Sequence, residues 1–375
     1  MLDAWLADTD LVIVATGMLT GTAASLLGAF LILRRNSMLA DAISHSIVLG
    51  IILVWLITRQ QSGPVQLVGA ALAGIATVAL TELVARTGKV KDDAAIGLVF
   101  PALFALGVLL LNLYARDIHL DQHTVLLGEI GFVWLKTMPL FGRDVPEALV
   151  WLGLVTTLNA TFVLLLFKEL KLATFDPALA HALGFAPSAL FAALLVLTSV
   201  TAVAAFEAVG VVLFVAFVIV PPAAAYLVTD RLERMILLGV AIALASSWLG
   251  YVAATALDVS IGGMMACVTG LFLVAAFLGG PRYGLVARLV AQRRQRLRDE
   301  CLALAVHLLT EEEHPGRPPT LPTAGRAWPA AQAARVLARS RRDGLVRDDR
   351  TRLVLTAKGR AAARALLEPW RAGGG

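Results

Sequence analysis

Long apolar stretches separated by short polar clusters occupy the chain from residue 11 to about residue 280. A helix needs about 20 mainly apolar residues to cross the hydrocarbon core of a bilayer, because each residue advances it by about 1.5 Å. The pattern therefore predicts an all-α polytopic membrane domain with about nine transmembrane helices, or eight if one stretch does not cross. The predicted spans are residues 11–33, 38–57, 65–86, 94–114, 148–168, 187–206, 209–228, 234–257 and 261–279.

Two other regions do not follow this pattern. Residues 119–141 are too polar and too interrupted for a span, so we expect a re-entrant or interfacial segment there. Beyond residue 285 the chain is rich in Arg, Asp and Glu. We therefore divide it into a transmembrane domain, residues 1–285, and a tail domain, residues 286–375.

The tail has its own order of elements. Residues 284–310 predict a basic, then amphipathic, helix, and a linker follows at residues 311–322. A helix is expected at residues 330–341. Two short strands at 345–347 and 353–355, and a last helix at 357–367, complete the tail. Helix, hairpin and helix in this order are typical of a small winged-helix α+β domain.

Composition supports this division. Hydrophobic residues make up 58% of the chain and charged residues 16%, against about 45–50% and about 25% in soluble domains. This excludes an ordinary soluble protein. Only two cysteines are present, Cys267 and Cys301, so a disulfide framework is not expected and both read as reduced, structural thiols.

The distribution of Lys and Arg among the loops predicts the orientation, because positively charged loops stay in the cytoplasm. One set of loops is strongly basic, and its members include Arg34, Arg35, Arg86, Lys89, Lys91, Lys168, Lys171, Arg231 and Arg234. The opposite set holds only Arg59, Arg116, Lys136 and Arg143. We therefore expect the N-terminus outside and the tail in the cytoplasm.

Asp41 and His45 are the strongest candidates for function, because ionisable groups inside a span are costly. Their i, i+4 spacing places both on one face of the second predicted helix. A carboxylate and an imidazole together suit Mn, Fe or Zn, whereas Mg and Ca prefer oxygen ligands alone. A structural ion pair, or a histidine bonded to nearby backbone, explains the same two residues equally well.

Weaker candidate ligands lie toward the opposite side. Glu207 falls near the outer end of the sixth predicted span, where it faces either a central path or the membrane interface. Glu129, in the polar segment at residues 119–141, is a candidate ligand of the same kind. His119 and His123 lie in an outer loop. A solvated polar loop is the simpler interpretation of the two histidines.

Four segments together resemble one family. Arg34–His45, Asp93–Phe100, Phe175–Gly184 and Ala208–Leu213, with two prolines beyond, occur in the order found in metal-ion ABC transporter permeases. That branch imports zinc, manganese or iron. The resemblance covers about residues 10–285.

The resemblance implies a fold, partners and roles. Two permease chains, identical or different, would pair around a central path in the bacterial cytoplasmic membrane. Two ATPase subunits would lie below them, and an extracytoplasmic lipoprotein would deliver the metal. In this family the acidic residue and histidine of the second span line the metal path, which implies that role for Asp41 and His45. The metal would be the cargo, and no resident cofactor is expected.

The resemblance also places the ATPase-coupling loop at Phe175–Gly184. Asp176 followed by Pro177 suits a helix N-cap and first turn, so a short helix is expected there. The residues implied in coupling are Asp176, Pro177, Ala180, Leu183 and Gly184. The 375 residues hold no Gly-x-x-x-x-Gly-Lys-Ser/Thr loop, so ATP hydrolysis is expected in another polypeptide and this chain is not an enzyme.

The transported ion and two competing functions stay open. Residues 121–130 look more like the manganese and zinc members of the family, which favours manganese, with zinc and iron next. A secondary metal transporter is one alternative. A membrane-bound metal sensor is another, with the tail as its output.

The tail resembles the DNA-binding domain of iron-dependent repressors of the diphtheria-toxin-repressor type. Its basic helix carries Arg335, Arg339, Arg341 and Arg342, which suit DNA phosphates. Tethering to a bilayer makes sequence-specific DNA binding awkward. A partner-binding module and a membrane-surface anchor are the competing interpretations.

Overall fold

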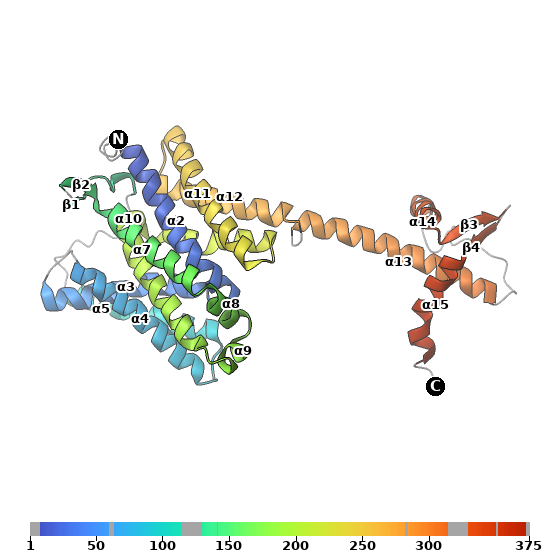
Figure 1. The fold of residues 1–375 in the computed structure, drawn as a ribbon, viewed down its shortest axis with the longest axis horizontal. Coiled ribbons are helices and arrows are strands. Elements are labelled where there is room, and N and C mark those ends of the chain that lie inside the picture. The colour runs from blue at the N-terminus through green and yellow to red at the C-terminus, as the bar shows by residue number, and fades with distance from the viewer. Residues whose placement is uncertain are drawn as a thin grey trace. The chain divides into compact units, whose positions relative to one another are not determined.

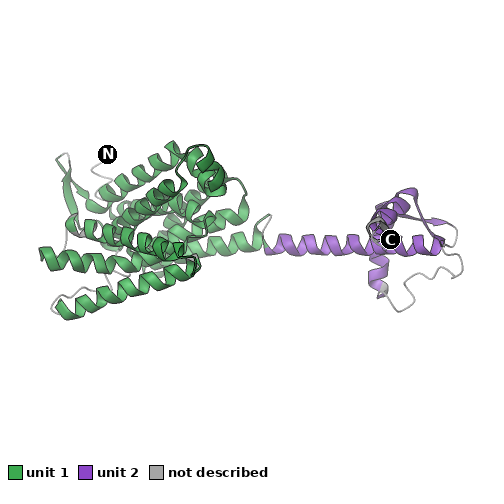
Figure 2. Cartoon of the chain, turned by 90° about the horizontal axis from the view of Figure 1, so that it is seen from below, with its two compact units in different colours: residues 1–284 green, residues 285–375 purple. Residues whose placement is uncertain are grey.

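A computed structural model describes residues 8–59, 64–114, 130–140, 142–281, 284–313, 329–349 and 352–372. The chain separates into two compact units, residues 1–284 and residues 285–375 (Figure 2).

Ten helices and one hairpin build the described part of the first unit (Figure 1). Eight of these helices are long and apolar enough to cross a membrane. They are α2 (Thr9–Leu33), α3 (Met38–Thr58), α4 (Pro64–Arg86), α5 (Asp92–Tyr114), α7 (Glu147–Leu165), α10 (Pro187–Val228), α11 (Leu232–Leu257) and α12 (Ile261–Gly279). Two short helices, α8 (Phe167–Phe175) and α9 (Pro177–Ala182), lie between α7 and α10.

Helix α10 contains two of the nine predicted spans, and its backbone breaks between them. Gly210 has φ 80° and ψ 168°, which is not a helical conformation. The rings of Phe206 and Phe214 are 5.3 Å apart, centroid to centroid. Eight positions along a straight helix would separate them by about 12 Å. The chain therefore turns sharply at Gly210.

Contacts with α2 show that the two legs of α10 run in opposite directions. The guanidinium carbon of Arg34, just beyond α2, lies 4.0 Å from the ring centroid of Phe191 in the first leg. Gly28, about 9 Å back along α2, packs directly on the backbone of Val218 in the second leg. A straight helix would separate Phe191 from Val218 by about 40 Å. Residues 187–209 and 211–228 therefore form an antiparallel pair.

Helix α2 lies in the centre of the first unit, because it is apolar on all sides. It packs against α7, α11 and both legs of α10, and its side chains Leu27, Phe30 and Leu31 are fully buried. Asn159 of α7 is buried here as well. Its amide donates to the Ala23 carbonyl of α2 and to Thr201 Oγ1 of α10, which ties three helices together in the core.

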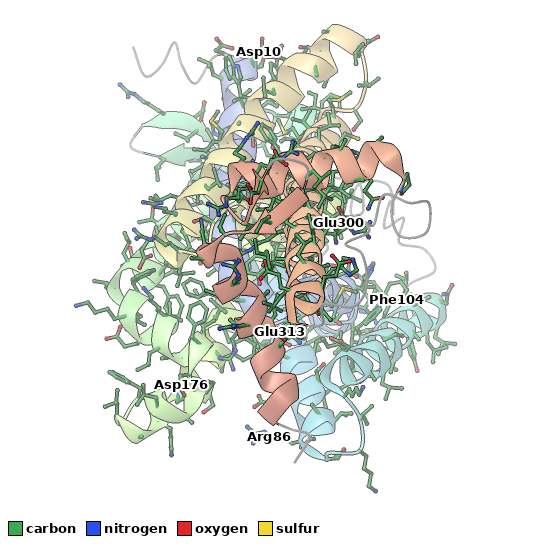
Figure 3. All side chains as sticks on the ribbon, turned by 90° about the vertical axis from the view of Figure 1, so that its right-hand side faces the viewer. Asp10, Arg86, Phe104, Asp176, Glu300 and Glu313 are labelled. Atoms are coloured by element: carbon green, nitrogen blue, oxygen red, sulfur yellow. The ribbon has the colours of Figure 1, made fainter. Side chains whose placement is uncertain are left out.

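The connecting elements mark two opposite ends of this unit. The hairpin β1 (Thr137–Leu140) and β2 (Arg143–Pro146) is antiparallel, with Thr137 opposite Pro146, and follows a short 3-10 turn at Ile130–Phe132. It lies at the end where α2 begins, whereas α8 and α9 lie at the other end (Figure 1). Asp10 and the pair Asp176 and Arg86 likewise occupy opposite ends (Figure 3). Residues 130–140 of the segment expected to be interfacial therefore hold a turn and a strand.

The second unit is a small α+β assembly. Helices α13 (Leu285–Glu313), α14 (Ala330–Arg342) and α15 (Ala357–Ala372) surround the antiparallel hairpin β3 (Val346–Asp349) and β4 (Arg352–Leu355), in which Val346 pairs with Leu355. The predicted helices and strands are confirmed to within a few residues, except that α13 continues three residues into the expected linker. The rest of that linker lies outside the described residues.

Apolar side chains from these elements form a separate core. Cys301, Leu304 and Leu308 of α13 pack with Val336 of α14 and Leu355 of β4. Burial raises the pKa of the Cys301 thiol, whose Sγ lies 3.7 Å from the Val336 carbonyl oxygen. This thiol is therefore protonated at neutral pH and serves as a packing group.

Candidate functional site

Asp41 and His45 lie side by side in the first two turns of α3. The distance between Asp41 Oδ1 and His45 Nε2 is 3.6 Å, and the two side chains are 35% and 34% exposed. They are thus neither sealed in the core nor fully open. A carboxylate oxygen and an imidazole nitrogen this close can act together on one cation.

Aromatic residues of α5 hold the imidazole in place. The His45 ring stacks on Phe100, with centroids 5.8 Å apart and planes at 27°. Phe104 approaches it edge-on, with centroids 5.9 Å apart. The two phenylalanines are four positions apart on α5, so they form a continuous wall on one side of the ring.

The opposite face of α3 is anchored in the bundle. Ile43 is fully buried, and the hydroxyl of Ser44 bonds to the Asp41 carbonyl. Further along, Gly50 of α3 and Gly69 of α4 pack backbone against backbone, with no room for a side chain at either position. Small residues of this kind let membrane helices approach closely. The packing therefore fixes the rotation of α3 that presents Asp41 and His45.

Glu207 does not lie beside this pair. It is in the first leg of α10, close to the turn at Gly210, and its Oε1 accepts a hydrogen bond of 2.6 Å from Lys136 Nζ. This bond raises the pKa of Lys136 above its usual value, partly offset by desolvation of the amine. The carboxylate is therefore neutralised by a lysine at the hairpin end of the unit.

The remaining predicted ligands, His119, His123 and Glu129, lie outside the described residues. Among the described residues, no group of three or more His, Cys, Asp and Glu side chains is arranged to hold a metal ion. Asp41 and His45 alone therefore do not make a complete coordination sphere.

The predicted short helix of the coupling segment is present as α9. Asp176 Oδ1 accepts a hydrogen bond of 2.9 Å from the Leu179 amide, and Pro177 occupies the first turn, as expected of this N-cap. Ala180 is fully buried, and Gly184, with φ 87°, ends the segment. The local sequence thus forms a short, capped helix at the end of the unit opposite the hairpin.

The outer surface of this segment is apolar. Phe175, Leu179 and Leu183 are 59%, 47% and 62% exposed. Three exposed large apolar side chains beside a short capped helix form a surface suited to another protein.

Arg34 was not among the predicted site residues. It is half-buried, and it connects the start of α10 to the turn before α3 through its contact with Phe191. Its place in the basic motif at residues 34–35 was the only available signal. Sequence reasoning used that motif for the orientation and for the family resemblance, and gave Arg34 no role in the site.

These features are typical of a polytopic membrane transport protein. The described residues form long apolar helices, and one of these helices carries an ionisable pair. The chain belongs to the ABC 3 transport family, whose sequence model matches residues 10–279.

Individual relatives support this assignment. The zinc transport system membrane protein TroD of Treponema pallidum is 42% identical over 360 residues, covering 95% of this chain and 98% of its own. The manganese transport system membrane protein MntD of Bacillus subtilis is 45% identical over 277 residues, covering 74% and 94%. The match to TroD thus extends into the second unit.

A solved structure has the same fold. PsaBC from Streptococcus pneumoniae in complex with Fab is similar with a TM-score of 0.62 and 25% identity, covering 75% of this chain and 96% of that chain.

Proposed function

We propose that this chain is the permease subunit of an ATP-binding cassette importer for a divalent transition-metal ion, with Asp41 and His45 on the ion path. The observation that carries the proposal is the carboxylate–imidazole pair, 3.6 Å apart and about one third exposed, inside a span of a family member. The relatives' names support the class of cargo, because they are zinc and manganese transport systems.

The pair supplies two ligands, one oxygen and one nitrogen. A divalent transition metal takes four or more ligands, so this site needs further donors. A second permease chain, facing the same path, is the natural source of them. The exposed third of each side chain is the part available to the ion.

The donor types bear on the ion. An oxygen and an imidazole nitrogen accept Mn, Fe and Zn, and the absence of thiolate leaves manganese competitive on ligand type. Manganese binds most weakly in this series, so its selection would depend on geometry or on a delivery protein outside the membrane. We propose manganese as the cargo, with zinc as the first competitor.

The movement of the ATPase subunit during ATP hydrolysis would be transmitted to this chain through α9. The chain lacks a phosphate-binding loop of the Gly-x-x-x-x-Gly-Lys-Ser/Thr type, which supports hydrolysis by a separate ATPase subunit. Phe175, Leu179 and Leu183 offer that subunit an apolar docking surface. The N-cap at Asp176 and Pro177 in the first turn would stabilise α9 when the ATPase subunit moves against it.

The excess of Lys and Arg at the α9 end supports a cytoplasmic location for that end and for the tail, with the N-terminus outside. The order of elements in the second unit supports the winged-helix resemblance.

The test is metal-stimulated ATP hydrolysis and metal uptake by the complete importer in proteoliposomes. We expect Asp41→Ala and His45→Ala each to abolish both activities for Mn, Zn and Fe while the complex still assembles. Asp144→Ala, which removes an exposed carboxylate from the hairpin, is the matched control and is expected to behave as the unmodified chain.

A second substitution separates the two sites. Asp176→Ala removes the cap of α9, so we expect weaker ATPase docking with metal binding to the permease unchanged. Normal uptake by either Asp41→Ala or His45→Ala would refute the proposed path.

A further inference from the structure

Helix α13 has two halves with different surroundings. From Cys301 onward it buries side chains in the core of the second unit. Between Leu285 and Arg296, by contrast, every side chain except Ala287 is exposed. The first half therefore has no packing partner within the described residues of the second unit.

The exposed half carries an apolar face. Leu285, Val286, Leu289 and Val290 are 42%, 56%, 49% and 44% exposed, and their spacing places them on one side of the helix. Ala291 lies on the opposite side. Exposing four large apolar side chains to water over two turns is unfavourable in free energy. Contact of this face with an apolar environment would therefore be favourable.

The same half carries the densest positive charge of the chain. Arg288, Arg293, Arg294, Arg296 and Arg298 precede the first acidic residue, Asp299, and none has an ion pair within the described residues. On the candidate DNA-contacting helix, by contrast, two of the four arginines are paired with carboxylates. Arg339 pairs with Asp343 at 2.9 Å, and Arg341 pairs with Asp348 at 2.7 Å. The first half of α13 thus carries five arginines free of ion pairs within the described residues, the largest such group on one helix of the second unit.

The charge balance of the chain repeats this asymmetry. Residues 285–375 contain 18 Lys and Arg against nine Asp and Glu, whereas residues 1–284 contain 14 against 18. The net positive charge of the protein therefore belongs to the second unit.

The position along the chain holds these groups close to the bilayer. Helix α12 ends at Gly279, and the Gly284 amide donates 3.0 Å to the Gly280 carbonyl, which closes a tight turn. Five residues separate α12 from Leu285. Even fully extended they would span no more than about 18 Å, so the start of α13 stays near the membrane surface. The arginines follow within about 20 Å along the helix, so all of them reach the surface when α13 lies along it.

We propose that residues 285–298 form an interfacial anchor that binds anionic phospholipid headgroups on the side where α12 ends. The apolar face enters the boundary between headgroups and acyl chains, and the arginines contact the lipid phosphates. Basic clusters immediately after a span are attracted to anionic lipid in this way. Arg293 and Arg294 lie one helical turn beyond Leu289 and Val290 on the same side, so this side of α13 offers the bilayer an apolar part followed by a basic part. The anchor fixes the second unit beside the bilayer.

The test uses the full-length chain, reconstituted in nanodiscs of phosphatidylcholine alone or of phosphatidylcholine with phosphatidylglycerol. Cys267→Ser removes the exposed thiol, and Cys301 is buried. A single environment-sensitive fluorophore is then placed by Leu289→Cys on the apolar face or by Ala291→Cys on the opposite side. Iodide quenching reports the exposure of each label to water.

We expect the label at position 289 to lose most of its iodide quenching in the anionic discs and to regain it in high salt or in phosphatidylcholine alone. The label at position 291 is expected to remain quenched in all conditions. Arg293→Glu with Arg294→Glu should abolish the difference between the two lipids, while the protein elutes as the same species.

Three outcomes would overturn the anchor. Equal quenching of the two labels in both lipids would show that the helix stays in water. Protection that is independent of lipid charge and salt would remove the role of the arginines. Protection of position 289 only after addition of the ATPase subunit would assign this face to a protein partner.

Discussion

The turn at Gly210 offers a sharp test of the bundle's construction, through the substitution Gly210→Ala. Its backbone, with φ 80° and ψ 168°, lies in a region that is essentially restricted to glycine. A Cβ at this position costs of order 1–3 kcal/mol if the backbone keeps its shape. Gly210 is buried, and Phe206 packs edge-on against Phe214 across the turn, so the backbone cannot relax without breaking that contact.

Gly153→Ala is the matched control. Gly153 lies inside α7, and a Cβ added there meets nothing within 4 Å. Replacing a glycine inside a helix by alanine gains roughly 0.5–1 kcal/mol, because fewer unfolded conformations are lost on folding. The two alanine variants should therefore differ in stability by about 1.5–4 kcal/mol, with Gly210→Ala the less stable.

The assay is thermal unfolding of both variants in one detergent, followed by the fraction that remains monodisperse after heating. We expect a lower midpoint for Gly210→Ala and an unchanged or higher midpoint for Gly153→Ala, relative to the unmodified chain. Equal midpoints for the two variants would show that the turn tolerates a side chain. The antiparallel legs would then not depend on glycine at this position.

Three further predictions concern contacts within the first unit. Arg34→Ala and Phe191→Leu should each lower the amount of metal transported per ATP hydrolysed, while ATP hydrolysis itself continues. The double variant should transport as much metal per ATP as either single variant. Additive losses in the double variant would refute direct coupling between the two residues. Gly50→Ala should separate α3 from α4 and reduce uptake, measured against the same glycine control as above. Glu207→Gln should lower stability by less than about 1 kcal/mol, because the pair with Lys136 is largely exposed. Since Glu207 raises the pKa of Lys136, this contribution is present at neutral pH and is lost as the pH rises through that raised pKa; unfolding midpoints across pH check this.

The spans could be predicted from the sequence, because the length and apolarity of a stretch decide whether it crosses a bilayer. The division of α10 was also visible, since Glu207 and Gly210 interrupt its apolar run. The β1–β2 hairpin was not predicted. Its strands have four residues each and no clear alternation, and only Gly142, with φ 77°, hints at the turn.

The candidate site was predictable only within α3. The i, i+4 spacing of Asp41 and His45 was enough to expect the two side chains to meet, because a helix fixes that geometry locally. Phe100 and Phe104, which hold the imidazole, come from another helix about 55 positions away. Contacts of this kind depend on how helices pack, and no local pattern encodes them.

The position of the pair along α3 bears on how ATP hydrolysis could reach it. Asp41 lies three residues into the helix, about 5 Å from its start, and Arg34 lies in the turn just before. Arg34 stacks on Phe191, which is in the first turns of α10, directly after α9. A displacement of α9 would therefore move the start of α10, and the contact between Phe191 and Arg34 would carry this movement to the turn before Asp41. His45, one turn further along and braced by α5, would move less than Asp41. We therefore expect the separation of the two proposed ligands to change when α9 moves. A pair built at the far end of α3 would lack this short route, and that is the physical reason to expect ion release at the α9 end, where the proposed ATPase subunit would dock.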